Sequence, residues 1–168
     1  EKPDAAGGLA LTVETIGPLA HGHDAIELHR GSGPLLEQLK AAIKRSKARK
    51  KSVLVETHGG DCLACVEIET AMAAPLVSMA KRHFNGTAPV SNVLSDVVVV
   101  RVDRDEWKSE LKAQGMYEKT APWFYRLSDD AKIVDKVSAD EWDENVPKNI
   151  APVLGAFTHG TLKKRRAP

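Results

Sequence analysis

The sequence lacks a long hydrophobic run, and no apolar stretch approaches the roughly 18 residues that suggest a membrane-spanning helix. It also lacks an excess of one charge, because 24 Lys and Arg residues face 23 Asp and Glu residues and leave a formal net charge of +1. A chain so balanced has no global field that would attract DNA or an anionic membrane. We therefore expect no transmembrane segment and no nucleic-acid partner.

Cysteine is almost absent, since Cys62 and Cys65 are the only two in 168 residues. Any redox role must therefore fall to this pair. Since 42% of the residues are apolar, the chain is long and apolar enough for one domain with its own core. We expect a monomer without a bound cofactor.

The stretch around the two cysteines reads as a strand, a loop and a helix. The run 53–55 is apolar and mostly β-branched, as in a strand buried on both faces, and Gly59 and Gly60 permit a sharp change of direction. Asp61 can cap the helix that follows. The pattern predicts that the helix begins at Cys62, with both cysteines in its first turn and on one face.

A cysteine at a helix N-terminus meets unpaired N–H groups and the positive end of the helix dipole, which favour the thiolate. A second thiol one turn away can resolve a mixed disulfide. The charge of Asp61 opposes the thiolate of Cys62, and Leu63 and Ala64 add no donor. We therefore expect a reducing to intermediate potential.

Three further features carry a resemblance to a known family. The hydrophobic triplet 53–55 is followed by Glu56, which lies six residues before Cys62. The segment 120–125, TAPWFY, places Pro122 before a hydrophobic strand, and the run 97–103, VVVVRVD, reads as a buried strand that ends in an acidic residue. With these marks the chain resembles the thioredoxin-like superfamily. It is most similar to extracytoplasmic members with the pattern C-x-x-C-x-x-x-E, here Cys62 to Glu69.

The resemblance implies an α/β thioredoxin fold with a central mixed sheet flanked by helices. We expect an N-terminal extension with short strands over 1–33, a thioredoxin-like domain over 34–160 with an inserted loop at 85–96 after the cysteine helix, and a basic flexible tail over 161–168. The other predicted elements are strands at 9–16 and 25–29, helices at 34–48, 105–114 and from 150, and a hairpin of strands 123–127 and 132–137. We expect the cysteine helix to continue to about residue 84, with Pro75 as a kink.

The resemblance also implies a thiol–disulfide oxidoreductase that exchanges the Cys62–Cys65 dithiol and disulfide with thiols and disulfides of protein partners. Cys62 would attack and Cys65 would resolve, with Glu56 as a buried proton acceptor and Pro122 in a cis peptide bond facing the pair. Glu56 has a plainer interpretation, in which it caps a backbone group. The expected substrate-binding residues are Ala121, Trp123, Gly60 and Asp61.

Two alternative functions stay open at this point. His58 could join Cys62 and Cys65 as the ligands of copper or zinc, as in thioredoxin-fold metallochaperones. The pair could also form a structural disulfide in a non-catalytic interaction module. The resemblance to extracytoplasmic proteins and the absence of Met at position 1 predict a periplasmic or secreted protein, and a cytoplasmic location stays open.

Overall fold

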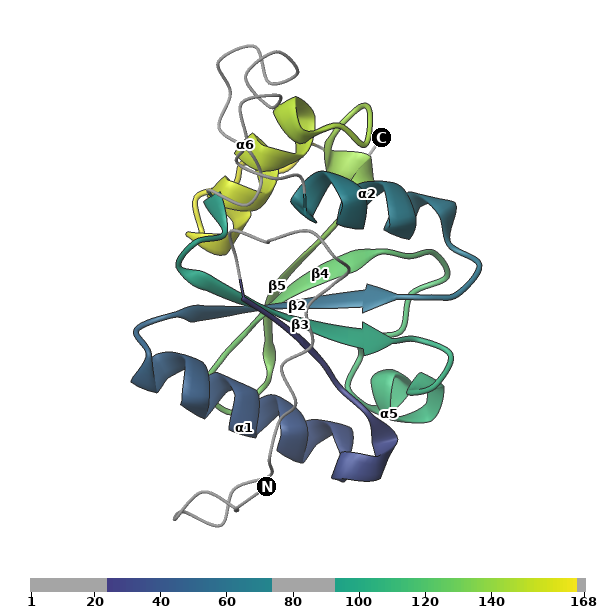
Figure 1. The fold of residues 1–168 in the computed structure, drawn as a ribbon, viewed down its shortest axis with the longest axis vertical. Coiled ribbons are helices and arrows are strands. Elements are labelled where there is room, and N and C mark those ends of the chain that lie inside the picture. The colour runs from purple at the N-terminus through teal and green to yellow at the C-terminus, as the bar shows by residue number, and fades with distance from the viewer. Residues whose placement is uncertain (1–23, 74–92, 166–168) are drawn as a thin grey trace.

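The computed structural model describes residues 24–73 and 93–165 (Figure 1). Three predicted features therefore lie outside the described residues: the strand at 9–16, the cysteine helix beyond residue 73 with its proline kink, and most of the loop at 85–96.

A five-stranded mixed sheet forms the centre of the molecule. Its strands are β1 (Asp24–Glu27), β2 (Ser52–His58), β3 (Val97–Asp103), β4 (Trp123–Leu127) and β5 (Ile133–Ser138), in the spatial order β1-β3-β2-β4-β5. β3 pairs in parallel with both β1 and β2, whereas β4 runs antiparallel to β2 and to β5. The short edge strand β1 belongs to the segment that we predicted as an extension, and it joins the same sheet.

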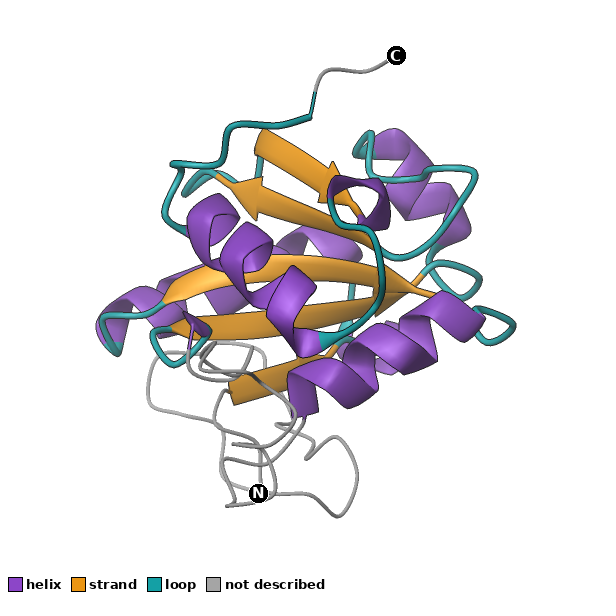
Figure 2. Ribbon diagram, turned by 90° about the horizontal axis from the view of Figure 1, so that it is seen from above, coloured by secondary structure: helices purple, strands orange, loops and turns teal. Residues whose placement is uncertain are grey.

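Helices cover both faces of the sheet (Figures 1 and 2). One face carries α1 (Leu35–Ala48) and α5 (Lys108–Ala113), and the other carries α2 (Leu63–Ala73) and α6 (Pro147–Thr158). None of the helices in the described ranges is both long and apolar enough to cross a membrane. The predicted fold class, a mixed sheet between helices, is confirmed.

Two helices begin three residues away from their predicted starts. α5 begins at Lys108 and not at 105, because Asp103 Oδ1 accepts hydrogen bonds from the N–H groups of Asp105 and Glu106 at 2.8 and 3.0 Å and holds them in a turn. α6 begins three residues earlier than 150, at Pro147, whose fixed φ suits the first helical turn.

Side-chain alternation along β2 and β3 divides the core into two halves. On β2, Val55 packs toward α1 and α5, whereas Leu54 packs toward α2 and α6. Since successive side chains point to opposite faces of a strand, Glu56 and Arg101 fall on the α2 face. Two charged residues thus lie in the layer between the sheet and the cysteine helix.

The basic C-terminal segment is described as far as residue 165. Lys164 contacts Asp135, and Arg165 Nη1 lies 2.8 Å from Asp143 Oδ1. Lys164 and Arg165 therefore face carboxylates of the β5–α6 region.

Candidate active site

The cysteine pair lies where β2 turns into α2, and its placement differs from the prediction. Asp61 was expected to cap the helix, but Cys62 occupies the position directly before Leu63, the first residue of α2. Its carbonyl accepts the N–H of Val66 at 3.2 Å and its Sγ accepts the N–H of Cys65 at 3.0 Å. The sulfur itself thus fills the capping role, because it reaches a backbone donor that is free in the first turn.

The two cysteines form a disulfide, so the structure represents the oxidised state. Cys62 is half-buried, whereas only 2% of Cys65 is exposed. A partner can therefore approach the sulfur of Cys62 more readily than that of Cys65. In the reduced protein the N–H of Cys65 would remain close to the Cys62 sulfur, where it favours a thiolate.

The loop before β4 faces the pair. The carbonyl oxygen of Ala121 lies 3.3 Å from the Sγ of Cys62, and the Ala121–Pro122 peptide bond is cis. The backbone of Ala121 therefore lies directly beside the exposed sulfur.

A shallow hollow of about 400 Å³ opens beside this sulfur. The residues that line it are Gly59, Asp61, Cys62, Arg104, Asp105, Thr120 and Ala121. Of the four predicted substrate-binding residues, it thus includes Asp61 and Ala121. Gly60 is exposed in the loop outside it, and Trp123 lies on β4, where its indole N–H donates to Thr120 Oγ1 at 3.3 Å.

Glu56 is almost fully buried on β2, with 1% of the residue exposed. Its nearest cation is Arg101, whose Nε lies 3.8 Å from Glu56 Oε2. In the described part of the chain Oε1 has no hydrogen-bond donor, so the alternative of a backbone-capping carboxylate finds no support there. Burial raises the pKa of Glu56 to about 7, although the charge of Arg101 acts in the opposite direction. Glu56 can therefore gain or lose a proton near neutral pH.

His58 points to a different partner from the one that the metal alternative requires. Its Nε2 lies 2.6 Å from Glu27 Oε1 on β1. Burial alone would lower the pKa of His58, but the hydrogen bond and charge of Glu27 outweigh it and raise that pKa. Within residues 24–73 and 93–165, no three His, Cys, Asp or Glu side chains are grouped as a metal site requires. In this oxidised structure His58, Cys62 and Cys65 therefore do not form a three-ligand group.

These observations decide the architecture. A central strand leads into the cysteine pair, a parallel strand lies beside it, and the proline loop faces the pair before an antiparallel hairpin. The chain has a thioredoxin fold.

Comparisons with known proteins are distant. No family model and no curated protein matches the chain. Among solved structures, Trxlp from Edwardsiella tarda EIB202 is 19% identical, with 70% of this chain and 91% of that chain covered and a TM-score of 0.40. Thioredoxin from Trichomonas vaginalis is 18% identical, with 80% and 94% covered and a TM-score of 0.42. The assignment of the thioredoxin fold rests on the strand arrangement described above.

Sequence reasoning missed the charged residues that surround Glu56. Arg101 contacts Glu27, Glu56 and Glu69, which come from three different elements. The sequence did contain a sign of this cluster, because Arg101 is the one cation in a strand of valines. Alternation places its side chain on the opposite face of the sheet from those of Val100 and Val102. The ion-pair partners of Arg101 depend on the register between neighbouring strands, which cannot be read from the sequence.

Proposed function

We propose that this protein is a thiol–disulfide oxidoreductase that exchanges the Cys62–Cys65 pair with protein partners. The observation that carries the proposal is a half-buried sulfur at a helix N-terminus, bonded to a buried one. The thioredoxin fold and the cysteine pair support thiol–disulfide chemistry in general. The protein partner and the sequence of steps are our inference.

The exchange proceeds in two displacements. The Cys62 thiolate attacks one sulfur of a partner disulfide, forms a mixed disulfide, and expels the other partner sulfur as a thiolate that takes up a proton. Cys65 then loses its proton, and its sulfur attacks Cys62 Sγ, so that the Cys62–Cys65 disulfide forms and the second partner thiolate leaves. Two electrons pass from the dithiol to the partner. The same steps in reverse, with a partner dithiol as the electron donor, restore it.

Glu56 serves as the proton acceptor for Cys65 in this proposal. Glu56 and Cys65 are both almost fully buried, and a carboxylic acid with a pKa of about 7 has the proton affinity that suits a general base at neutral pH. The backbone of Ala121 supplies pairing groups for an extended segment of the partner next to the exposed sulfur. Asp61 and Thr120 border the same hollow.

The reduction potential of the pair tests the proposal. The protein is equilibrated with mixtures of reduced and oxidised glutathione, and free thiols are counted by alkylation. We expect a reversible two-electron couple between about −270 and −120 mV. A disulfide that stays intact at potentials far below that range would have a structural role, and this result would contradict the oxidoreductase proposal.

The first turns of α2 offer a docking surface for a protein partner. Leu63 lies between the two cysteines and Val66 directly follows them. Their exposed fractions, 72% and 56%, are unusual for large apolar residues in the described chain. We expect Val66→Ser to slow reduction of a protein disulfide such as that of insulin about 5-fold, since a lost contact at an interface costs on the order of 1 kcal/mol. The rate with glutathione disulfide, which is too small to cover this surface, should stay unchanged.

Val134→Ser is the matched control for this measurement. Val134 is 57% exposed, but it lies on β5 and not beside the cysteines. An equal loss in both variants, or an equal loss with glutathione disulfide, would contradict docking at α2.

A further inference from the structure

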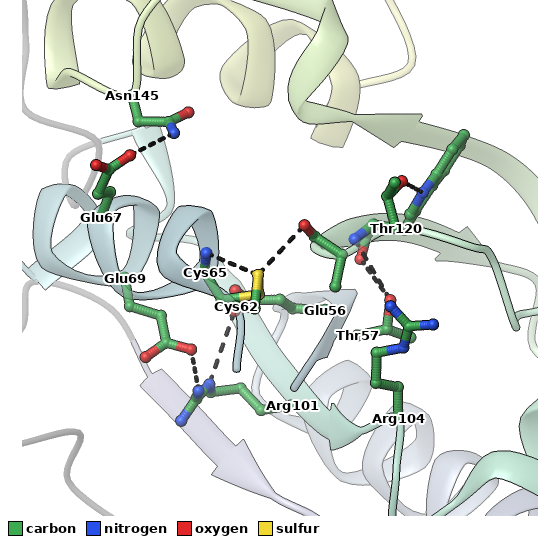
Figure 3. The surroundings of a disulfide bond; sticks show 12 residues. Glu56, Thr57, Cys62, Cys65, Glu67, Glu69, Arg101, Arg104, Thr120 and Asn145 are labelled. Carbon is green, nitrogen blue, oxygen red and sulfur yellow. Dashed lines mark hydrogen bonds and ion pairs between the residues drawn. A yellow bond between two sulfur atoms is a disulfide. The ribbon is translucent and has the colours of Figure 1, made fainter. Parts of the chain in front are cut away.

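Five ionisable side chains meet between the sheet and α2. Glu27, Arg101 and Glu56 lie in one row across β1, β3 and β2, because the parallel register pairs both glutamates with Arg101. His58 faces Glu27 from β2. Glu69 enters the cluster from α2, where it contacts Arg101 (Figure 3). Three carboxylates therefore surround one guanidinium in a layer with little access to water.

The guanidinium of Arg101 contacts Glu27 and Glu69 more closely than it contacts Glu56. Its Nη1 lies 3.0 Å from Glu27 Oε2, and its Nη2 donates to Glu69. Only Nε faces Glu56, at 3.8 Å, and this buried nitrogen makes no hydrogen bond to any described residue. The two terminal nitrogens of Arg101 thus contact Glu27 and Glu69. Of the three carboxylates, Glu56 therefore has the weakest interaction with the guanidinium.

The number of charges favours a proton on Glu56. Glu27 and Glu69 together already exceed the single charge of Arg101, so ionisation of Glu56 would add a third negative charge. His58 adds a compensating charge only when it is protonated, and it is held by Glu27. Charges interact strongly in a layer of low dielectric constant. The distance between the Arg101 guanidinium and Glu56 therefore determines how tightly Glu56 binds its proton.

Glu69 is placed on the helix that also carries the cysteines. It follows Cys65 by four residues, so the two side chains lie on the same face of α2 one turn apart. The helix therefore fixes the position of the buried thiol and that of the carboxylate that engages Arg101 at the same time.

We propose that Glu69 is a positioning residue, which holds the Arg101 guanidinium away from Glu56 and so leaves Glu56 free to exchange a proton at neutral pH. This inference rests on the proposed function, in which Glu56 takes the proton of Cys65. Glu69 acts through Arg101 and does not touch the sulfurs. Its removal frees Nη2 to turn toward Glu56 and also deletes a neighbouring negative charge, and both changes favour the ionised form of Glu56.

The test is the titration of the Glu56 carboxyl carbon by NMR in the full chain, in wild type and in Glu69→Gln. We expect the midpoint of Glu56 to move about one pH unit lower in the variant, as for a carboxylate that gains a cation. Glu67→Gln is the matched control, since it removes the same charge from α2 at a position where the carboxylate accepts a hydrogen bond from Asn145 and not from Arg101. Its midpoint should match wild type.

Glu69→Asp keeps the charge but shortens the side chain, and we expect a smaller shift in the same direction. An unmoved midpoint in both Glu69 variants, or an equal shift in Glu67→Gln, would overturn the inference. The rate of exchange with glutathione disulfide is followed over the same pH range, and its midpoint should move with that of Glu56. If the carboxyl midpoint moves while wild type shows no exchange at any pH, the proposed function fails and the role of Glu69 stands.

Discussion

Replacement of Cys62 by serine is expected to reduce thiol–disulfide exchange to the rate measured without protein, whereas replacement of Cys65 by serine should trap partners. The reason is the difference in access: the sulfur of Cys62 faces the hollow beside Ala121, and the sulfur of Cys65 is buried. Without Cys65 the mixed disulfide on Cys62 has no resolving thiol. Non-reducing electrophoresis of each reduced variant, after incubation with a disulfide-bonded protein such as insulin, separates the two cases.

The two variants control for each other. Both lose the Cys62–Cys65 disulfide, which closes a loop so short that its loss costs only about 2 kcal/mol in the chain-entropy model. Any effect of lost stability is therefore shared, and only the trapping separates them. Trapping by Cys62→Ser in place of Cys65→Ser would reverse the assigned roles. If neither variant formed a mixed disulfide, thiol–disulfide exchange would lose its support.

The elements with strong local patterns were predictable. The valine run predicted a strand at 97–103, which coincides with β3, and the apolar spacing of 34–48 predicted α1 to within one residue. A run of β-branched residues suits a strand buried on both faces, and a repeat near 3.6 residues suits a helix on a sheet. Each pattern is a property of a single segment, so it can be recognised without knowing which other segments pack against it.

The features that depend on two segments were not predictable. The cap of α2 was expected from Asp61, the stronger capping residue by type, yet the chain geometry gives that position to Cys62. The closeness of His58 to the cysteines in the sequence favours it as their partner, whereas the sheet places it against Glu27. The cluster around Arg101 follows from strand order and register, which long-range packing determines.

Glu56→Gln should make the folded protein more stable at high pH while it slows exchange. Burial raises the pKa of Glu56 from 4.5 to about 7, so the folded state binds a proton that the unfolded state has already released between these values. The stability of wild type therefore falls as pH rises through this window, by about 3 kcal/mol for this group. Glutamine has no proton to lose. Denaturant unfolding at pH 5 and pH 8 should show the difference between variant and wild type grow by most of that amount, because the unfolded glutamate is already largely ionised at pH 5.

The same substitution removes the proposed base. In a Glu56→Gln protein Cys65 must lose its proton to water, so we expect the mixed disulfide on Cys62 to resolve about 100-fold more slowly at pH 7, at the low end of general-base effects. Glu67→Gln, on the outer side of the same helix, should change neither the pH dependence of stability nor the resolution rate. A stability difference that does not vary with pH would mean that Arg101 keeps Glu56 ionised throughout. Slower resolution together with greater stability at pH 8 would mean that the buried carboxylate is retained for proton transfer at a cost to the fold.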